Sequence, residues 1–113
     1  MKILDKAISI DELKKIALET FGDLTKAVVD VDRGLIALDA ELHSDLEALL
    51  LENGSRQKDL WGVNLYPGNT GEDFIEFDSM INMRPSQGNK SCGIDDEKTR
   101  GKIIEVIDKW VKR

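Results

Sequence analysis

Two acidic side chains, Glu76 and Asp78, stand two positions apart in the alternating segment that starts at Ile75. In an extended strand such residues point the same way and lie about 7 Å apart. That separation is typical of a carboxylate pair that flanks a reacting bond, so the pair could perform acid–base chemistry or hold a cation. The simpler interpretation is a solvated sheet face on which Arg84 balances the carboxylates, and we favour it.

A polar loop, RPSQGNKSCG, follows this segment and covers residues 84–93. The guanidinium of Arg84 and the amides of Gln87 and Asn89 could hold a small anion or a polar ligand. The loop leads toward a helix start, but Asp95 and its acidic neighbours would repel a phosphate there. The alternative is a structural loop whose side chains bond its own backbone, and this alternative is favoured.

The only histidine, His43, lies one helical turn before Glu47 in the segment ELHSDLE. Such a pair could supply two metal ligands, but a third would have to come from elsewhere, so we expect no metal and no cofactor. The favoured interpretation is a half-exposed histidine bonded to a carboxylate. Cys92 could act as a nucleophile only beside a base, and His43 stands on a different element.

Three segments with amphipathic periodicity are expected to form helices. Ser9 and Glu12 have capping-box spacing at the start of the first segment. Asp39 and Asp95 are the expected N-caps of the second and third segments, and Asn53 with the glycine after it ends the second. The expected helices are residues 9–22, 39–54 and 95–113.

The segments between the helices are expected to form strands. In the hairpin over residues 26–39, Arg33 and Gly34 form the turn, so that Val31 pairs with Ile36 and Val29 with Leu38. Two more strands, residues 60–66 and 74–84, flank the turn PGNTGE, and residues 1–4 could add a short one.

The resulting fold class is α+β, a mainly antiparallel sheet of four or five strands with three helices in the order α-β-β-α-β-β-α. We expect residues 1–113 to form one domain, with all helices packed on the apolar face of the sheet. The other face would stay uncovered and would carry a polar surface. Its expected members are Asn64, Tyr66, Glu76, Asp78, Asn82 and Arg84.

The composition argues against two classes of partner. A net charge of −6 disfavours nucleic acid, because phosphate backbones repel an acidic chain. No apolar run approaches the roughly 20 residues that span a membrane. The single cysteine is typical of a cytoplasmic protein.

Several longer motifs give the chain a resemblance to a known family. They are ELHSDLE, DLWGVNLYP and IEFDSMINMRPSQGN, and the match runs over about residues 9–110. The chain resembles small prokaryotic proteins that are grouped as a domain of unknown function. The resemblance therefore implies a shared fold but no particular activity.

The sequence favours a small interaction or binding module that forms a homodimer or docks a protein partner through the uncovered face and the 84–93 loop. The alternative is a small enzyme or ligand-binding protein in which the loop holds a polar or anionic molecule and Glu76 or Asp78 is the acid or base. His43 and Glu47 rank lower as site residues. The candidate ligand or interface residues are Asn64, Tyr66, Glu76, Asp78, Asn82, Arg84, Gln87 and Asn89.

Overall fold

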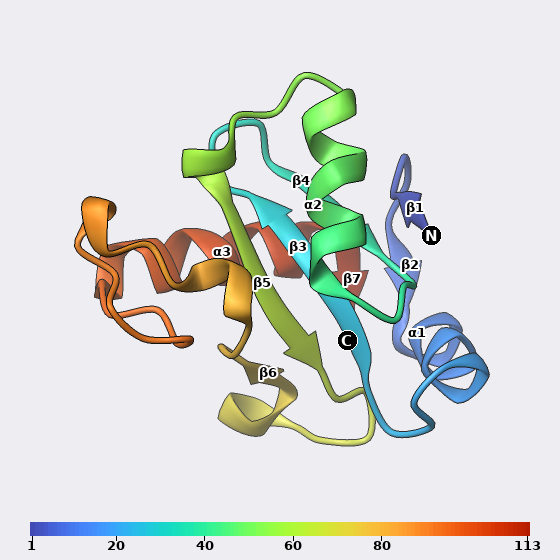
Figure 1. Ribbon diagram of the computed structural model, residues 1–113. Coiled ribbons are helices and arrows are strands. Elements are labelled where there is room, and N and C mark those ends of the chain that lie inside the picture. The colour runs from blue at the N-terminus through green and yellow to red at the C-terminus, as the bar shows by residue number, and fades with distance from the viewer.

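A five-stranded antiparallel sheet organises the chain, which a computed structural model describes over residues 1–113 (Figure 1). The spatial order is β1-β4-β3-β5-β6, so the longest strands lie at the centre and two-residue strands form both edges. Such short edges offer few free backbone groups to another chain. The strands are β1 Lys2–Ile3, β3 Thr25–Asp30, β4 Leu35–Leu38, β5 Leu60–Leu65 and β6 Ile75–Glu76.

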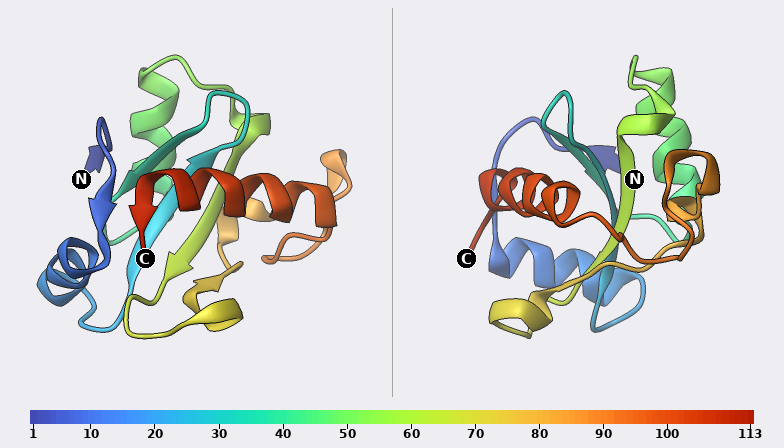
Figure 2. Two further views of the ribbon diagram at one scale, coloured as in Figure 1. Left: turned by 180° about the vertical axis from the view of Figure 1, so that it is seen from behind. Right: turned by 90° about the vertical axis from the view of Figure 1, so that its left-hand side faces the viewer.

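Helices lie on both faces of this sheet. Seen along its edge, α1 and α3 lie on one side and α2 on the other, together with the chain that follows β6 (Figure 2). The helices are α1 Ile10–Glu19, α2 His43–Glu52 and α3 Glu97–Trp110. A short parallel pair, β2 Ile8–Ser9 with β7 Val111–Lys112, joins the start of α1 to the end of α3. Four 3₁₀ turns complete the chain: η1 Gln57–Asp59, η2 Gly71–Phe74, η3 Met80–Asn82 and η4 Pro85–Gln87.

The core has two parts because both faces of the central strands are buried. On the first face, side chains such as Val29 and Val63 pack against α1 and α3. On the second face, Val28, Ala37 and Leu60 pack against Leu46 and Leu50 of α2. Strands buried on both sides need apolar residues at consecutive positions, which accounts for the runs AVV in β3 and LIAL in β4.

The prediction of α+β architecture with three helices is therefore confirmed, but the prediction of an uncovered sheet face is wrong. The helix α2 covers one part of that face, and the chain after Glu76 folds back over another. The predicted strand over residues 74–84 ends at Glu76, and Asn82 is fully buried instead of lying on an open surface.

The first hairpin forms with a different register from the predicted one. Val29 pairs with Ile36, so the turn is longer than the expected two residues. The cause is Asp30, whose buried carboxylate accepts the N–H groups of Asp32 and Arg33 at 2.9 Å each. Because the shift is by two positions, Val29 and Ile36 remain on the same face as predicted.

The predicted helix caps are right in one case and displaced in two. The Ser9 hydroxyl accepts the Glu12 N–H at 3.1 Å, as the capping box requires. The third helix is capped by Asp96, whose side chain accepts the Thr99 N–H, instead of by Asp95. Asp39 does not cap α2, which begins at His43. The strand predicted over residues 1–4 is present as β1.

None of the helices has the length and apolar character needed to cross a bilayer.

Candidate functional site

A row of polar side chains lies at one end of the second sheet face. Lys26 of β3 pairs with Asn64 of β5, and Asn64 pairs with Glu76 of β6, so the three side chains point to the same side of three adjacent strands. Gly62 precedes them on this side of β5. Asn64 and Glu76 belong to the predicted polar surface, and of the three side chains only Glu76 is exposed.

Asn64 is held at the base of this row and is only 5% exposed. Its Nδ2 donates to Glu76 Oε1 at 2.8 Å and to the Asp78 carbonyl at 3.4 Å. A carboxylate accepts hydrogen bonds, so this contact fixes which end of the amide faces Glu76. The opposite end, Asn64 Oδ1, is buried and has no hydrogen-bond partner.

Tyr66 joins the same carboxylate from the end of β5. Its hydroxyl donates to Glu76 Oε1 at 3.2 Å. Loss of hydration raises the pKa of Tyr66, and the negative charge of Glu76 raises it further, so the phenol stays protonated and remains a donor. Three of the predicted site residues, Asn64, Tyr66 and Glu76, are thus in direct contact.

His43, the first residue of α2, packs over this row and is 7% exposed. Its Nε2 lies 2.8 Å from the Val63 carbonyl oxygen, which can only accept, so Nε2 carries the proton. The adjacent Cδ2 faces Gly62, where an added Cβ would lie 3.1 Å away. Since Nε2 and Cδ2 face the sheet, the opposite ring atom, Nδ1, points away from it as an unprotonated acceptor. Burial lowers the pKa of His43, which favours this neutral form.

These side chains border a cleft of about 380 Å³, which we call the Asn64 cleft. It lies between the start of α2, strands β3 and β5, and the segment of residues 78–92. Leu42, Met80 and Ile81 give it an apolar rim. The polar or sulfur-bearing residues of its wall include Lys26, His43, Asn64, Asp78 and Cys92. The Cys92 thiol lies 3.6 Å from Met80 Sδ at this rim.

Asn82, a predicted ligand or interface residue, instead completes the sheet. Its Oδ1 accepts the Gly62 N–H at 2.8 Å, and its Nδ2 donates to the Gly62 carbonyl at 2.9 Å. The same Nδ2 donates to the Cys92 carbonyl at 3.0 Å. A carboxamide thus occupies the place of a neighbouring strand beside Gly62, which removes Asn82 from any surface role.

Asn89 is also internal and organises the loop of residues 84–93. Its Nδ2 donates to the carbonyls of Asn82 at 2.7 Å and Gly93 at 2.8 Å, and its Oδ1 accepts the Asp95 N–H at 2.9 Å. The favoured prediction for this loop, that side chains bond its own backbone, describes Asn89 correctly.

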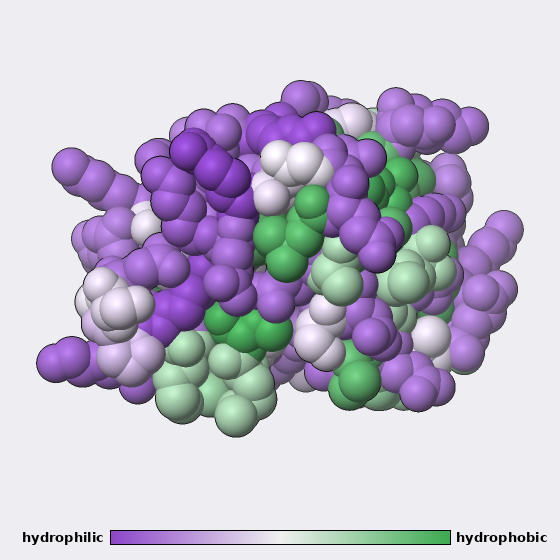
Figure 3. All heavy atoms as spheres, turned by 45° about the horizontal axis from the view of Figure 1, so that its top comes forward, coloured by the Kyte–Doolittle hydropathy of each residue, from purple (hydrophilic) through white to green (hydrophobic).

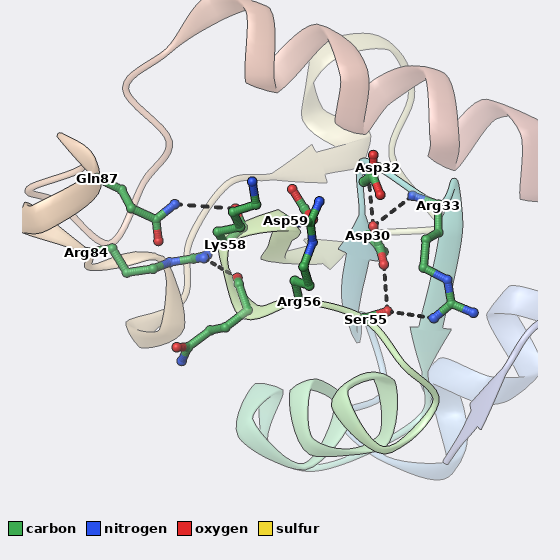
Figure 4. A network of polar contacts seen from close by, with 10 residues as sticks. Asp30, Asp32, Arg33, Ser55, Arg56, Lys58, Asp59, Arg84 and Gln87 are labelled. Atoms are coloured by element: carbon green, nitrogen blue, oxygen red, sulfur yellow. Dashed lines mark hydrogen bonds and ion pairs between the residues drawn. The ribbon is translucent and has the colours of Figure 1, made fainter.

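Arg84 and Gln87 reach across to the 3₁₀ turn η1 (Figure 4). The Arg84 guanidinium donates to the carbonyls of Gln57 and Leu60, and its central carbon lies 4.2 Å from the centre of the Trp61 ring. Burial lowers the pKa of Arg84, while the negative charge of Glu47 opposes this shift. Arg84 therefore fastens the loop to the sheet and does not present a free guanidinium to a ligand.

The predicted pair of His43 and Glu47 does not act as a unit. His43 faces the Asn64 cleft, whereas Glu47 provides charge near Arg84 and has a buried oxygen, Oε2, without a partner. The structure brings together no group of three or more histidine, cysteine, aspartate and glutamate side chains that could hold a metal ion.

Comparison with known proteins gives one match. A family model described as "Protein of unknown function (DUF5674)" covers residues 2–110. The chain belongs to the DUF5674 family. No curated protein and no solved structure matches it. The resemblance to a family of unknown function is confirmed at this level, and membership assigns no activity.

In this DUF5674 chain another opening, larger than the Asn64 cleft, lies between the 84–93 loop, η1 and the start of α3. It measures about 540 Å³, and its charged residues have both signs, including Lys58, Lys102, Asp59 and Asp95. Gln87 and Asn89 line this opening, but Arg84 does not, and both the Arg84 guanidinium and the Asn89 amide are already bonded to backbone carbonyls. The Asn64 cleft is therefore the stronger candidate site.

Sequence reasoning about the DUF5674 chain missed Lys26, Ser79 and Met80 as residues of the cleft. Nothing in the local sequence relates Lys26 to a loop so far along the chain. Gly62 did carry a signal, since a glycine inside an apolar strand often marks a close approach of another segment. His43 and Cys92 border the same cleft, although they lie on distant parts of the sequence.

Proposed function

We propose that the chain is a small binding module whose site is the Asn64 cleft. The observation that carries this proposal is the buried Asn64 Oδ1 without a partner. An unsatisfied buried acceptor costs about 1–3 kcal/mol, and buried polar groups are nearly always paired. A ligand that donates a hydrogen bond to this oxygen would recover that energy on binding.

The rigidity of the surrounding residues supports the same function. Asn64 is fixed by Glu76, which is itself fixed by Tyr66, and His43 is fixed by the Val63 carbonyl. Binding groups that are held in place before the ligand arrives lose little entropy when it binds. This arrangement suits recognition of a ligand or of a partner's side chain.

The form of the molecule favours insertion into the cleft over docking on a flat surface. Both faces of the sheet are covered, and its edge strands have two residues each. On the face that Figure 3 shows, hydrophobic residues form separate patches among hydrophilic ones. A homodimer or protein complex would therefore use the cleft and its apolar rim.

We also propose that the protein is cytoplasmic, because its sequence has a single cysteine.

The test is an NMR titration of the ¹⁵N-labelled protein with small probes of different charge. The probes are methylguanidinium, n-butylammonium, acetamide, acetate and inorganic phosphate. We expect at least one at millimolar concentration to shift the Asn64 side-chain amide and the Gly62 amide, and Asn64→Leu to abolish the shift of Gly62. Asn69→Ala, at an exposed asparagine remote from the cleft, is the control variant. If none of the probes shifts these signals, the proposal fails.

The second candidate function is a small acid–base enzyme, and one observation favours it. The neutral His43 directs an unprotonated Nδ1 away from the sheet in the cleft that Cys92 also borders. In this function His43, instead of Glu76 or Asp78, is the base that takes a proton from water or from a thiol. Hydrolysis of p-nitrophenyl acetate that disappears in His43→Gln while folding persists would support it, and equal rates in both proteins would exclude this chemistry.

A further inference from the structure

The hydrogen-bonding groups of the Asn64 cleft are unbalanced toward acceptors. Asn64 Oδ1 has no partner, and Nδ1 is the free acceptor of the neutral His43 ring. The Asp78 side chain adds a carboxylate, and no bond to this carboxylate is present within the chain. A ligand that suits this set must offer several N–H or O–H donors at once.

Two carboxylates and one cation lie in or next to the cleft. Lys26 is the only cation of its wall, and its ammonium lies 5.3 Å from the centre of the Phe21 ring, where the aromatic face engages it. No arginine borders the cleft. Asp78 and Glu76 would repel an anion, and the net charge of −6 attracts cations to the molecule as a whole.

The rim supplies the apolar part of the recognition. Leu42 is 57% exposed and Met80 is 75% exposed, although both are large hydrophobic side chains. They line the same cleft as Asp78. An alkyl chain that carries a positive nitrogen group at its end would cover this apolar rim while its charge reaches the acceptors.

From these three features we infer that the Asn64 cleft binds an alkyl-guanidinium or alkyl-ammonium group. This inference rests on the proposed function and specifies its ligand class. The group donates to Asn64 Oδ1 and His43 Nδ1 and forms a charge-assisted bond with Asp78. It can come from a free amine or guanidine or from the side chain of an arginine or lysine in a partner protein, because both sources present the same chemistry.

The experiment compares ligands that differ only in charge. The probes are Nα-acetyl-arginine amide, its neutral isostere Nα-acetyl-citrulline amide, Nα-acetyl-lysine amide and agmatine, each titrated into the labelled full chain. We expect binding of the cations at the Asn64 and Gly62 signals, at least about tenfold weaker binding of the citrulline compound, and a loss of affinity with added salt. Tighter binding of agmatine identifies a free ligand, and tighter binding of the arginine or lysine amide identifies a protein side chain; either result supports the inference.

Matched variants separate a specific site from general attraction. Asp78→Asn should weaken cation binding about tenfold, because it removes one charge-assisted bond without changing side-chain size. Asp73→Asn makes the same change at an exposed aspartate in η2, outside the cleft, and should leave binding unchanged. Equal weakening in both variants would overturn the inference.

The outcomes also distinguish this inference from the proposed function. If acetamide, acetate or phosphate shifts the Asn64 signals and the cations do not, the cleft is a binding site and the inferred ligand class is wrong. If the citrulline compound binds as tightly as the arginine compound, the cleft does not recognise the positive charge of the ligand, and the inference is again overturned. If no probe of any charge binds, both proposals fail together.

Discussion

Gly62 is the position in the sheet where a single added methyl group should be least tolerated. A Cβ on Gly62 would lie 2.6 Å from Ser79 Cβ, 2.7 Å from Ser79 Oγ and 3.1 Å from His43 Cδ2. Ser79 cannot easily move away from Gly62, because its N–H donates to the Cys92 carbonyl at 2.9 Å and its hydroxyl accepts the Ile81 N–H at 3.3 Å. Gly62→Ala must therefore push the chain after β6 away from the sheet.

The expected magnitude follows from overpacking. Extra methyl groups in a well-packed core cost about 1–3 kcal/mol, and we expect the upper end because two walls are too close. Displacement of the chain after β6 would also stretch the bonds between Asn82 and Gly62. For a chain of this length 1 kcal/mol corresponds to about 4 °C in Tm, so Gly62→Ala should lower Tm by about 12 °C.

The control is the same substitution at a site without neighbours. Gly101 lies on the exposed side of α3, and nothing lies within 4 Å of an added Cβ. Gly101→Ala should raise the free energy of unfolding by about 1 kcal/mol, because alanine is the better helix former. Urea unfolding and thermal unfolding followed by circular dichroism would measure both variants.

A second substitution tests the cause of the effect. Ser79→Gly removes both atoms that an alanine at position 62 would strike, so the double variant should recover a substantial part of the loss, seen as a favourable coupling energy. If Gly62→Ala is as stable as the parent chain, or if the two substitutions add without coupling, the described packing of Ser79 on β5 is wrong.

Three further predictions concern the residues around this contact. Asn82→Ala should lower the free energy of unfolding by about 3 kcal/mol in urea unfolding, because the N–H and C=O of Gly62 lose their partners in a buried place; a loss below about 1 kcal/mol would contradict this role. Arg84→Lys should lower the free energy of unfolding by about 1–2 kcal/mol in the same assay, since an ammonium cannot donate to both carbonyls and stack on the Trp61 ring at the same time. An unchanged urea midpoint would show that Arg84 does not fasten the loop to the sheet. The His43 pKa is lowered by burial, so the unfolded chain takes up the proton first, and the free energy of unfolding should fall as pH drops below the unfolded value of about 6.5 and stop falling below the folded pKa. Urea midpoints across this range should lose that slope in His43→Gln, and a slope that persists would assign it to other groups.

Much of the fold was predictable because it depends on local signals. The capping box at Ser9, the periodicity of the helices and the apolar strand from Leu60 each act over a few residues. The hairpin register was not predictable from its Arg33–Gly34 pair. It depends on the side chain of Asp30, which is buried and accepts a bond from Ser55 at 2.5 Å, far along the chain (Figure 4).

The candidate site was predicted only in part, for a reason that lies in the segment after Ile75. Its alternation of apolar and polar residues is typical of a strand, but a sequence pattern does not say which backbone groups will be paired. Beside Gly62 the long strand is replaced by the side-chain amide of Asn82, and the amide of Asn89 holds the loop that follows. From the sequence alone, an asparagine in a polar motif is equally compatible with a side chain that bonds a ligand and with one that bonds backbone groups in place of a strand.

The short β6 and the Asn64 cleft have a common origin. If β6 continued beside β5, its next residues would lie against Gly62 and would follow the sheet past the start of α2. Instead the chain leaves the sheet after Glu76, and Asn82 satisfies Gly62 from a 3₁₀ turn. Asn64, which borders this opening, is left with a buried Oδ1 that has no partner.

This origin divides the polar residues of the region by role. Asn82 and Asn89 make their bonds to backbone groups inside the chain, so their replacement should change stability. The Asp78 carboxylate has no partner inside the chain, so its replacement should change binding with little effect on unfolding. Asn64 has both roles, because Oδ1 has no partner while Nδ2 donates to Glu76, so its replacement should change both properties. Stability and ligand affinity measured on variants at Asp78, Asn82 and Asn89 should therefore vary independently. A correlation between the two would show that the cleft is only a by-product of packing.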